Sequence, residues 1–162
     1  MQSLFNYKPH LKLSLQYFWM LKDFKIKKAI IKDDKTLEVI FQTKNKFVYF
    51  IAGLFQKKGF PISAYSSFRL VFMASIIGAG YVLKKKKLDG AVIVRDFHIE
   101  YEKPIMYKSN TNISVIVKTT ILKTTDSFHI YETQFVIGKN EGHTGTTKLY
   151  YCKPSLKDFS YT

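Results

Sequence analysis

The chain has 162 residues, of which 46% are hydrophobic and 16% are aromatic. This length suits one domain, and the apolar share excludes a mainly disordered chain, because a sizeable core can be buried. The formal net charge is +14, from 26 basic and 12 acidic residues. We therefore predict one domain over residues 1–162 that attracts polyanions, such as nucleic acid, an anionic membrane or an acidic carrier protein.

The basic residues are almost all lysines, since only Arg69 and Arg95 are arginines. Surfaces that read a nucleic-acid sequence rely on arginine forks, so this balance argues against such a surface. A genome that favours lysine codons would also raise the charge without any functional reason. Nucleic-acid binding is therefore kept only as an alternative.

Cys152 is the single cysteine, which excludes an internal disulfide framework and a cysteine-rich zinc site. The spacing of the histidines does not suggest a metal site either, and we predict no metal and no cofactor. The N-terminal segment lacks the continuous apolar run of a signal peptide. The most apolar window, residues 70–83, is too short to span a bilayer. We expect a cytoplasmic protein without a transmembrane segment.

The first predicted elements are a short amphipathic helix and a β-hairpin. Residues 11–24 carry apolar side chains at a spacing closer to a helix than to a strand. Residues 25–42 alternate between apolar and polar, and Asp33, Asp34 and Lys35 interrupt the alternation with residues typical of turns.

A long helix is predicted at residues 66–83, where nearly every residue is apolar and only Arg69 is charged. A helix that is apolar on nearly every side is buried on nearly every side. Gly78 and Gly80 each cost about 1 kcal/mol of helix propensity relative to alanine. Closer approach of a packed strand would compensate for this cost.

The remaining residues, 91–152, predict about four strands joined by short polar turns. Strict alternation along residues 91–102 would place Val92, Val94 and Asp96 on one face, with Phe97 and Ile99 on the other. Enclosing the central helix requires a curved sheet. The predicted fold class is therefore α+β, with a long central helix wrapped by a curved antiparallel β-sheet.

Two segments contain a recognisable motif. Residues 63–68, Ser-Ala-Tyr-Ser-Ser-Phe, lie at the start of the predicted central helix. Residues 88–105 contain a Leu-Asp-Gly turn and a strand, with the motif positions Leu88, Asp89, Gly90, Asp96, Ile99, Tyr101 and Pro104. Both segments resemble the hot-dog thioesterase-like domain that some bacteria carry alone or fused to an acetyltransferase. In element order the likeness extends over about residues 24–151.

This resemblance implies a hot-dog fold, a homodimer or a dimer of dimers, and an acyl chain in a tunnel beside the helix. The head of the ligand would be coenzyme A or an acyl carrier protein. The family usually has an asparagine, and often a histidine, a few residues before the helix. Residues 56–61 contain neither.

The candidate catalytic residues are Ser66, Ser67 and Asp96. Thioester hydrolysis needs a base and donors for the developing oxyanion. Backbone N–H groups near Tyr65, Ser66 and Ser67 would supply the donors at the start of the helix, where the helix dipole is positive. Capping of the helix by Ser63, Ser66 or Ser67 is the structural alternative. Asp96 is the candidate base by motif, although alternation places it on a solvated face unless a bulge turns it inward.

The candidate substrate-binding residues are Ser63, Tyr65, Arg69, Lys84 and Lys85. Arg69 would meet a phosphate or carboxylate at the mouth of the tunnel, or else form an internal ion pair or lie in a partly exposed first turn. The lysines of residues 84–87 would contact the phosphates of coenzyme A or an acidic carrier protein, or else form a solvated helix end.

Three functions follow from these observations. The first is hydrolysis of an acyl-CoA or acyl-carrier-protein thioester. The second is binding of an acyl thioester or fatty acid without turnover, which the missing asparagine and histidine favour. The third is binding of nucleic acid, which the net charge and the scattered aromatic residues support.

Overall fold

A computed structural model describes residues 23–44, 60–84, 91–107, 110–138 and 142–152. The helix predicted at residues 11–24 lies outside these ranges, except for its last two residues. Phe24 is the first residue of a strand rather than the end of that helix.

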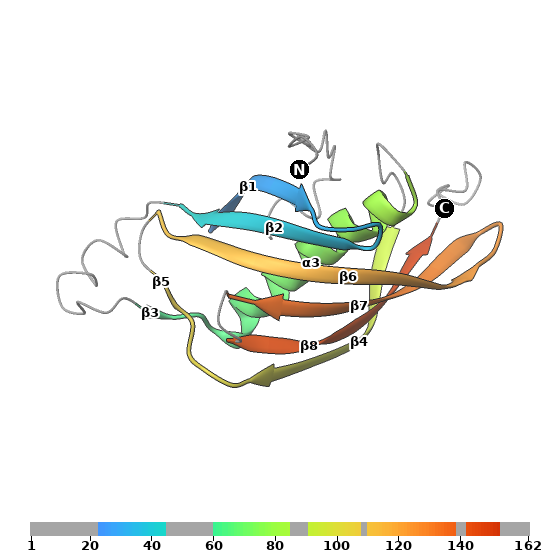
Figure 1. Cartoon of the computed structure of the whole chain (residues 1–162). Helices are drawn as coiled ribbons and strands as arrows, with labels where there is room; N and C mark the ends of the chain where they lie inside the picture. Colours follow the sequence, from blue (N-terminus) through green and yellow to red (C-terminus); the bar gives the residue numbers. More distant parts are fainter. Residues whose placement is uncertain (1–22, 45–59, 85–90, 108–109, 139–141, 153–162) are drawn as a thin grey trace, which may run out of the picture.

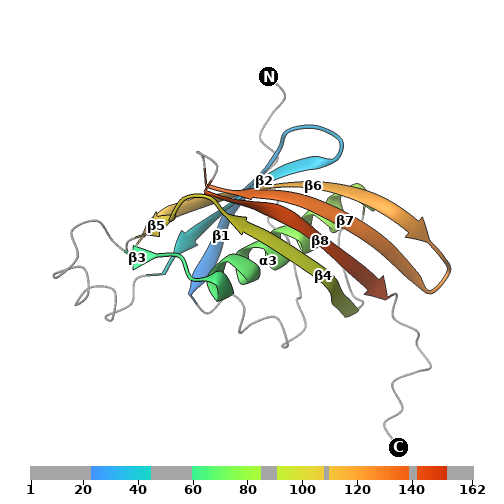
Figure 2. The same ribbon diagram turned by 90° about the horizontal axis from the view of Figure 1, so that it is seen from below.

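The described elements form a long helix and a six-stranded antiparallel sheet. The sheet order is β1-β2-β6-β7-β8-β4, and a separate two-stranded pair joins β3 to β5. In Figures 1 and 2 the sheet curves around helix α3. The elements are β1 (Phe24–Ile31), β2 (Thr36–Thr43), β3 (Phe60–Pro61), α3 (Ala64–Val82), β4 (Ala91–Tyr101), β5 (Met106–Tyr107), β6 (Asn112–Thr124), β7 (Phe128–Ile137) and β8 (His143–Cys152). The predicted fold class is confirmed, whereas the short β3 and β5 were not predicted.

The first hairpin forms where the turn residues predicted it. Asp33 Oδ1 accepts the backbone N–H groups of Lys35 at 2.8 Å and of Thr36 at 2.9 Å. These hydrogen bonds hold the pKa of the Asp33 carboxyl below its ordinary value. The turn therefore fixes the pairing of β1 with β2, in which Ile31 lies opposite Leu37.

Helix α3 begins two residues earlier than predicted because Ser63 caps it. The Ser63 hydroxyl accepts the N–H of Ser66. The helix is long and apolar enough to cross a membrane, yet 72% of its most apolar window is buried inside the fold. It is the core helix, packed against β2, β6 and β7.

Gly78 marks the closest approach of α3 to the sheet. A Cβ at this position would lie 2.6 Å from Thr119 Oγ1 and 3.3 Å from Val117 Cγ2, both on β6. These distances confirm at Gly78 the close strand approach that the sequence predicted. Thr119 is fully buried and its hydroxyl lies 3.3 Å from that of Thr133 on β7.

The predicted alternation along β4 is wrong across Arg95. The register of β4 against β8 shifts between Val94 and Asp96, which is a β-bulge. As a result Val92 and Val94 pack against the same core as Phe97 and Ile99. The bulge carries Phe97 into contact with Phe68 of α3, at a ring separation of 5.0 Å, and Asp96 stays exposed.

Candidate functional site

The first turns of α3 meet the start of β8 through a hydroxyl–imidazole pair. Ser67 Oγ lies 3.0 Å from His143 Nδ1. Ser67 is 0% exposed and His143 is 2% exposed. The side chain of Ser67 tilts toward the N-terminal end of the helix, as helical side chains do, so the pair lies beside the first turn of α3.

His143 is almost fully buried, and this burial lowers the pKa of the imidazole below its ordinary value. The neutral imidazole therefore dominates at neutral pH. In the tautomer with its proton on Nε2, Nδ1 accepts the hydrogen of the Ser67 hydroxyl. The ring of Tyr101 meets that of His143 edge to face, with centroids 4.6 Å apart. A neutral imidazole held against a hydroxyl is the arrangement of a general base and a nucleophile.

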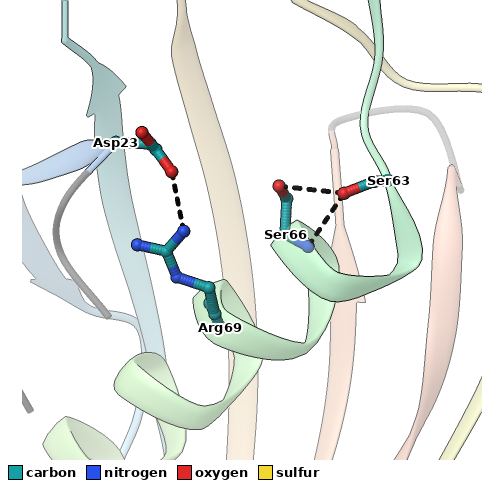
Figure 3. Close-up of polar contacts among 4 residues, drawn as sticks. All are labelled: Asp23, Ser63, Ser66 and Arg69. Atoms are coloured by element: carbon teal, nitrogen blue, oxygen red, sulfur yellow. Dashed lines mark hydrogen bonds and ion pairs between the residues drawn. The ribbon is translucent and has the colours of Figure 1, made fainter. Parts of the chain in front are cut away.

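The other two serines form the cap of α3. The Ser63 hydroxyl accepts the Ser66 N–H at 3.2 Å and lies 3.1 Å from Ser66 Oγ (Figure 3). The backbone carbonyl of Ser63 accepts the N–H of Ser67 at 2.9 Å. The capping interpretation therefore holds for Ser63, and the N–H groups of Ser66 and Ser67 are both engaged within the helix.

Arg69 takes part in an internal ion pair, the structural alternative that its sequence position left open. Its guanidinium Nη1 lies 2.7 Å from Asp23 Oδ2 (Figure 3). The same group lies over the rings of Phe24 and Tyr65, at 5.8 and 5.5 Å from their centroids. Tyr65 is exposed on the first turn of α3. A substrate role for Arg69 and Tyr65 stays a prediction.

Lys84 lies far from the three serines at the start of α3. Lys84 is exposed just beyond the C-terminal end of α3, and Lys85 falls outside the described residues. At 1.5 Å per residue, Lys84 is about 25 Å from Ser67 along the helix axis. A single ligand that contacts both Lys84 and Ser67 must therefore span most of the length of α3.

Asp96 is not brought together with Ser66 and Ser67. Its side chain is 60% exposed, and its carboxylate lies 3.7 Å from Arg95 Nε. His98, two residues further along β4, has its Nε2 3.2 Å from Glu100 Oε1 and is not paired with Asp96. A catalytic role for Asp96 stays a prediction, without support from these contacts.

A thioesterase from Haemophilus influenzae is a solved structure with a similar fold. It is 8% identical, with a TM-score of 0.51, and the match covers 82% of this chain and 81% of that chain. The chain has the hot-dog fold. At this identity the likeness shows the fold alone, so the activity has to be argued from the site.

Two further solved structures are similar to this hot-dog chain. Zebrafish thioesterase superfamily member 2 is 13% identical, with a TM-score of 0.47, over 82% of this chain and 84% of that chain. An uncharacterised protein from Pyrococcus horikoshii is 16% identical, with a TM-score of 0.48, over 81% and 86%. No family model matches the chain, and no curated protein matches it in sequence.

The hot-dog core also contains a small apolar pocket at the far end of α3 from Ser67. It is lined by Ala29, Ile31, Leu37, Ile77 and Tyr81.

Within the described ranges, no three histidine, cysteine, aspartate or glutamate side chains gather as metal ligands would.

Sequence reasoning missed His143 as a site residue. It is separated from Ser67 by 76 positions, so no local motif joins them. The sequence did contain one signal. Side chains on a strand alternate between its two faces, so His143 shares a face with Leu149 and Tyr151, which are buried on the inner side of the sheet. A histidine on that face is either a hydrogen-bonded core residue or part of a site.

Proposed function

We propose that this protein hydrolyses acyl thioesters, of coenzyme A or an acyl carrier protein, at the N-terminal end of α3. The observation that carries the proposal is the buried hydrogen bond between Ser67 and His143. A hot-dog fold and a helix N-terminus beside the pair support the same function, because the developing oxyanion is stabilised by backbone N–H groups and by the helix dipole.

The reaction divides into two acyl transfers. Ser67 Oγ attacks the thioester carbonyl carbon while its proton passes to His143 Nδ1, and the positive end of the α3 dipole stabilises the oxyanion. The carbon–sulfur bond then breaks, and the thiolate takes the proton from His143 and leaves as the thiol. Water, deprotonated by the same imidazole, attacks the acyl-serine and releases the carboxylic acid and the Ser67 hydroxyl.

The test is release of free thiol from acyl-CoAs of short to long chain length by the purified protein. Ser67→Ala should abolish turnover, and the Ser67 peptide of the wild type should carry the acyl group in rapidly quenched samples. Thr124→Ala is the matched control, because Thr124 Oγ1 lies 3.0 Å from His129 Nδ1 in an equivalent pair on β6 and β7. Equal activity of the Ser67→Ala variant and the wild type would overturn the proposal.

Asp96 provides the comparison between the two candidate bases. If His143 is the base, Asp96→Asn should retain turnover and His143→Asn should lose it, with both variants folded. Loss of turnover in Asp96→Asn alone would instead assign the base to Asp96, as the family resemblance implies.

The burial of Ser67 and His143 favours a second candidate function. A pair that is almost completely enclosed suits a protein that binds an acyl thioester or fatty acid without turnover. Absence of thiol release at every chain length, together with lipid detected by native mass spectrometry, would identify this binding function.

We also propose that two copies of the chain pair along β4. Strands β1 and β4 are the two edges of the six-stranded sheet. Edge β1 carries exposed lysines at positions 25, 27 and 28 and a bulge, which discourage pairing. Edge β4 is 11 residues long, and its Ile93 is an exposed large hydrophobic residue.

Analytical ultracentrifugation tests this pairing. Ile93→Lys on β4 should shift the protein toward the monomer. Ile31→Lys is the matched control, because Ile31 lies on edge β1 and is 48% exposed against 55% for Ile93. A dimer that survives Ile93→Lys and dissociates in Ile31→Lys would place the interface on the other edge.

A further inference from the structure

The Ser67–His143 pair is enclosed, whereas the aromatic residue packed on it faces solvent. Tyr101 is 48% exposed, against 0% for Ser67 and 2% for His143. A substrate therefore reaches the pair only after a neighbouring side chain moves. Among the described contacts of His143, the contact with Tyr101 is the one made by an exposed residue.

The geometry of Tyr101 suits a side chain that covers the imidazole. Tyr101 and His143 are directly paired across β4 and β8. Their rings lie 4.6 Å apart at an interplanar angle of 73°, which is a favourable edge-to-face contact. Tyr101 is also the last residue of β4, an edge strand paired only with β8 within the described sheet. Its ring therefore lies at a border of the sheet and not in the middle of a packed layer.

The backbone beside Tyr101 is fixed. The N–H groups of Glu102 and Lys103 both donate to the carbonyl of Gly142, at 3.2 and 3.1 Å. The side chain of Ile105 packs on Gly142 where a Cβ would stand. These contacts tie the chain after β4 to the residue before His143, so exposure of the imidazole requires rotation of the tyrosine side chain and not displacement of the strand.

We propose that the Tyr101 side chain is the gate of the Ser67–His143 pair, and that an acyl thioester reaches the pair past the last residue of β4 when this ring turns outward. This inference rests on the proposed function for the identity of the ligand. Tyr101 is a positioning and access residue in this scheme, since it takes no part in bond making.

Chemical labelling of histidine tests the gate without requiring turnover. Diethyl pyrocarbonate acylates accessible neutral imidazoles, and peptide mass spectrometry reports the rate for each histidine separately. In the purified full-length chain, Tyr101→Ala should increase the labelling rate of His143 at least about threefold, the effect expected for loss of an edge-to-face ring contact. Tyr101→Phe keeps the ring and should leave the rate at its wild-type value.

Two other histidines in the same digest serve as references. His129 is 7% exposed, is hydrogen-bonded to Thr124 and stacks on Tyr151, so it reports any general loosening of the fold. His98 is exposed on β4 and reports the reagent concentration. A selective increase at His143 in Tyr101→Ala supports the gate. An unchanged His143 rate, or an equal increase at His143 and His129, overturns it.

The labelling and thiol-release experiments distinguish failure of the gate proposal from failure of the hydrolase proposal. Faster His143 labelling in Tyr101→Ala, with no thiol release by any variant, leaves the gate in place and removes the hydrolase. Thiol release that depends on Ser67, with His143 labelling unaffected by Tyr101→Ala, leaves the hydrolase in place and removes the gate.

Discussion

His143 should make the stability of the fold sensitive to acid. Burial holds the pKa of its imidazole below the ordinary value of 6.5. As the pH falls below that value, the unfolded chain binds a proton that the folded chain does not, so the free energy of unfolding decreases until the folded pKa is reached. Urea unfolding at a series of pH values should show this loss in the wild type and a smaller one in His143→Asn. Identical pH dependence in the two proteins would contradict the prediction.

Arg69 and Asp23 should behave as a buried structural pair. Removal of one member of such a pair takes the ion-pair partner from a buried charge, so Asp23→Asn should cost up to about 3–5 kcal/mol of unfolding free energy. Arg69→Met replaces the charge by an apolar side chain of similar size and should cost less. Chemical denaturation of the two variants compares these costs. An Arg69→Met variant that is stable but weaker in substrate binding would restore the substrate role predicted from the sequence.

The residues of the site were predictable to different degrees. Ser63, Ser66 and Ser67 were identifiable because serine next to an apolar run marks a helix start, and the cap at Ser63 confirms that signal. The partners of Ser67 and Arg69 were not identifiable. His143 and Asp23 reach them through tertiary packing over 76 and 46 positions, and no periodicity spans such separations.

At the level of elements, Gly78 should be intolerant of a side chain although it lies inside a helix. Gly78→Ala adds about 1 kcal/mol of helix propensity, but its methyl group would lie 2.6 Å from Thr119 Oγ1. Overpacking of this kind costs about 1–3 kcal/mol, so we expect net destabilisation in thermal or urea unfolding. In a double-mutant cycle Thr119→Ala should recover part of the loss, since it removes the closest atom. A Gly78→Ala protein as stable as the wild type would show that β6 shifts enough to accommodate the added methyl group.

Strand β4 shows why an alternation pattern fails at one residue. Apolar and polar side chains alternate on each side of Arg95, but the bulge adds one residue and exchanges the two faces. The sequence does contain both halves of the pattern: Val92 with Val94, and Phe97 with Ile99. What it lacks is a sign of the register shift, because the shift accompanies tertiary contacts of Phe97 with Phe68 and Phe135 that are distant in sequence.

For the whole molecule, the fold was predictable because its strongest signals are long. A 19-residue helix that is apolar on nearly every side has to be enclosed, and the strands that follow supply a sheet of matching length. The order β1-β2-β6-β7-β8-β4 was not predictable from these signals. It depends on pairings between strands that are not consecutive in the chain, namely β2 with β6 and β4 with β8. The edges β1 and β4, and with them the proposed dimer and gate, follow from that order.

The net charge of +14 leads to a prediction about polyanions that separates the hydrolase from the nucleic-acid alternative. Lysine-rich binding through phosphate neutralisation loses about 10³-fold or more in affinity between about 50 and 200 mM salt, because bound counterions are released. We expect retention on heparin and on duplex DNA to collapse together over this range, without preference for a DNA sequence, since only two of the 26 basic residues are arginines. Thiol release measured at about 200 mM salt should be unaffected by added DNA, because the Ser67–His143 pair lies inside the fold. Sequence-selective binding that persists at this salt concentration, in a protein without thiol release, would identify a nucleic-acid-binding function instead.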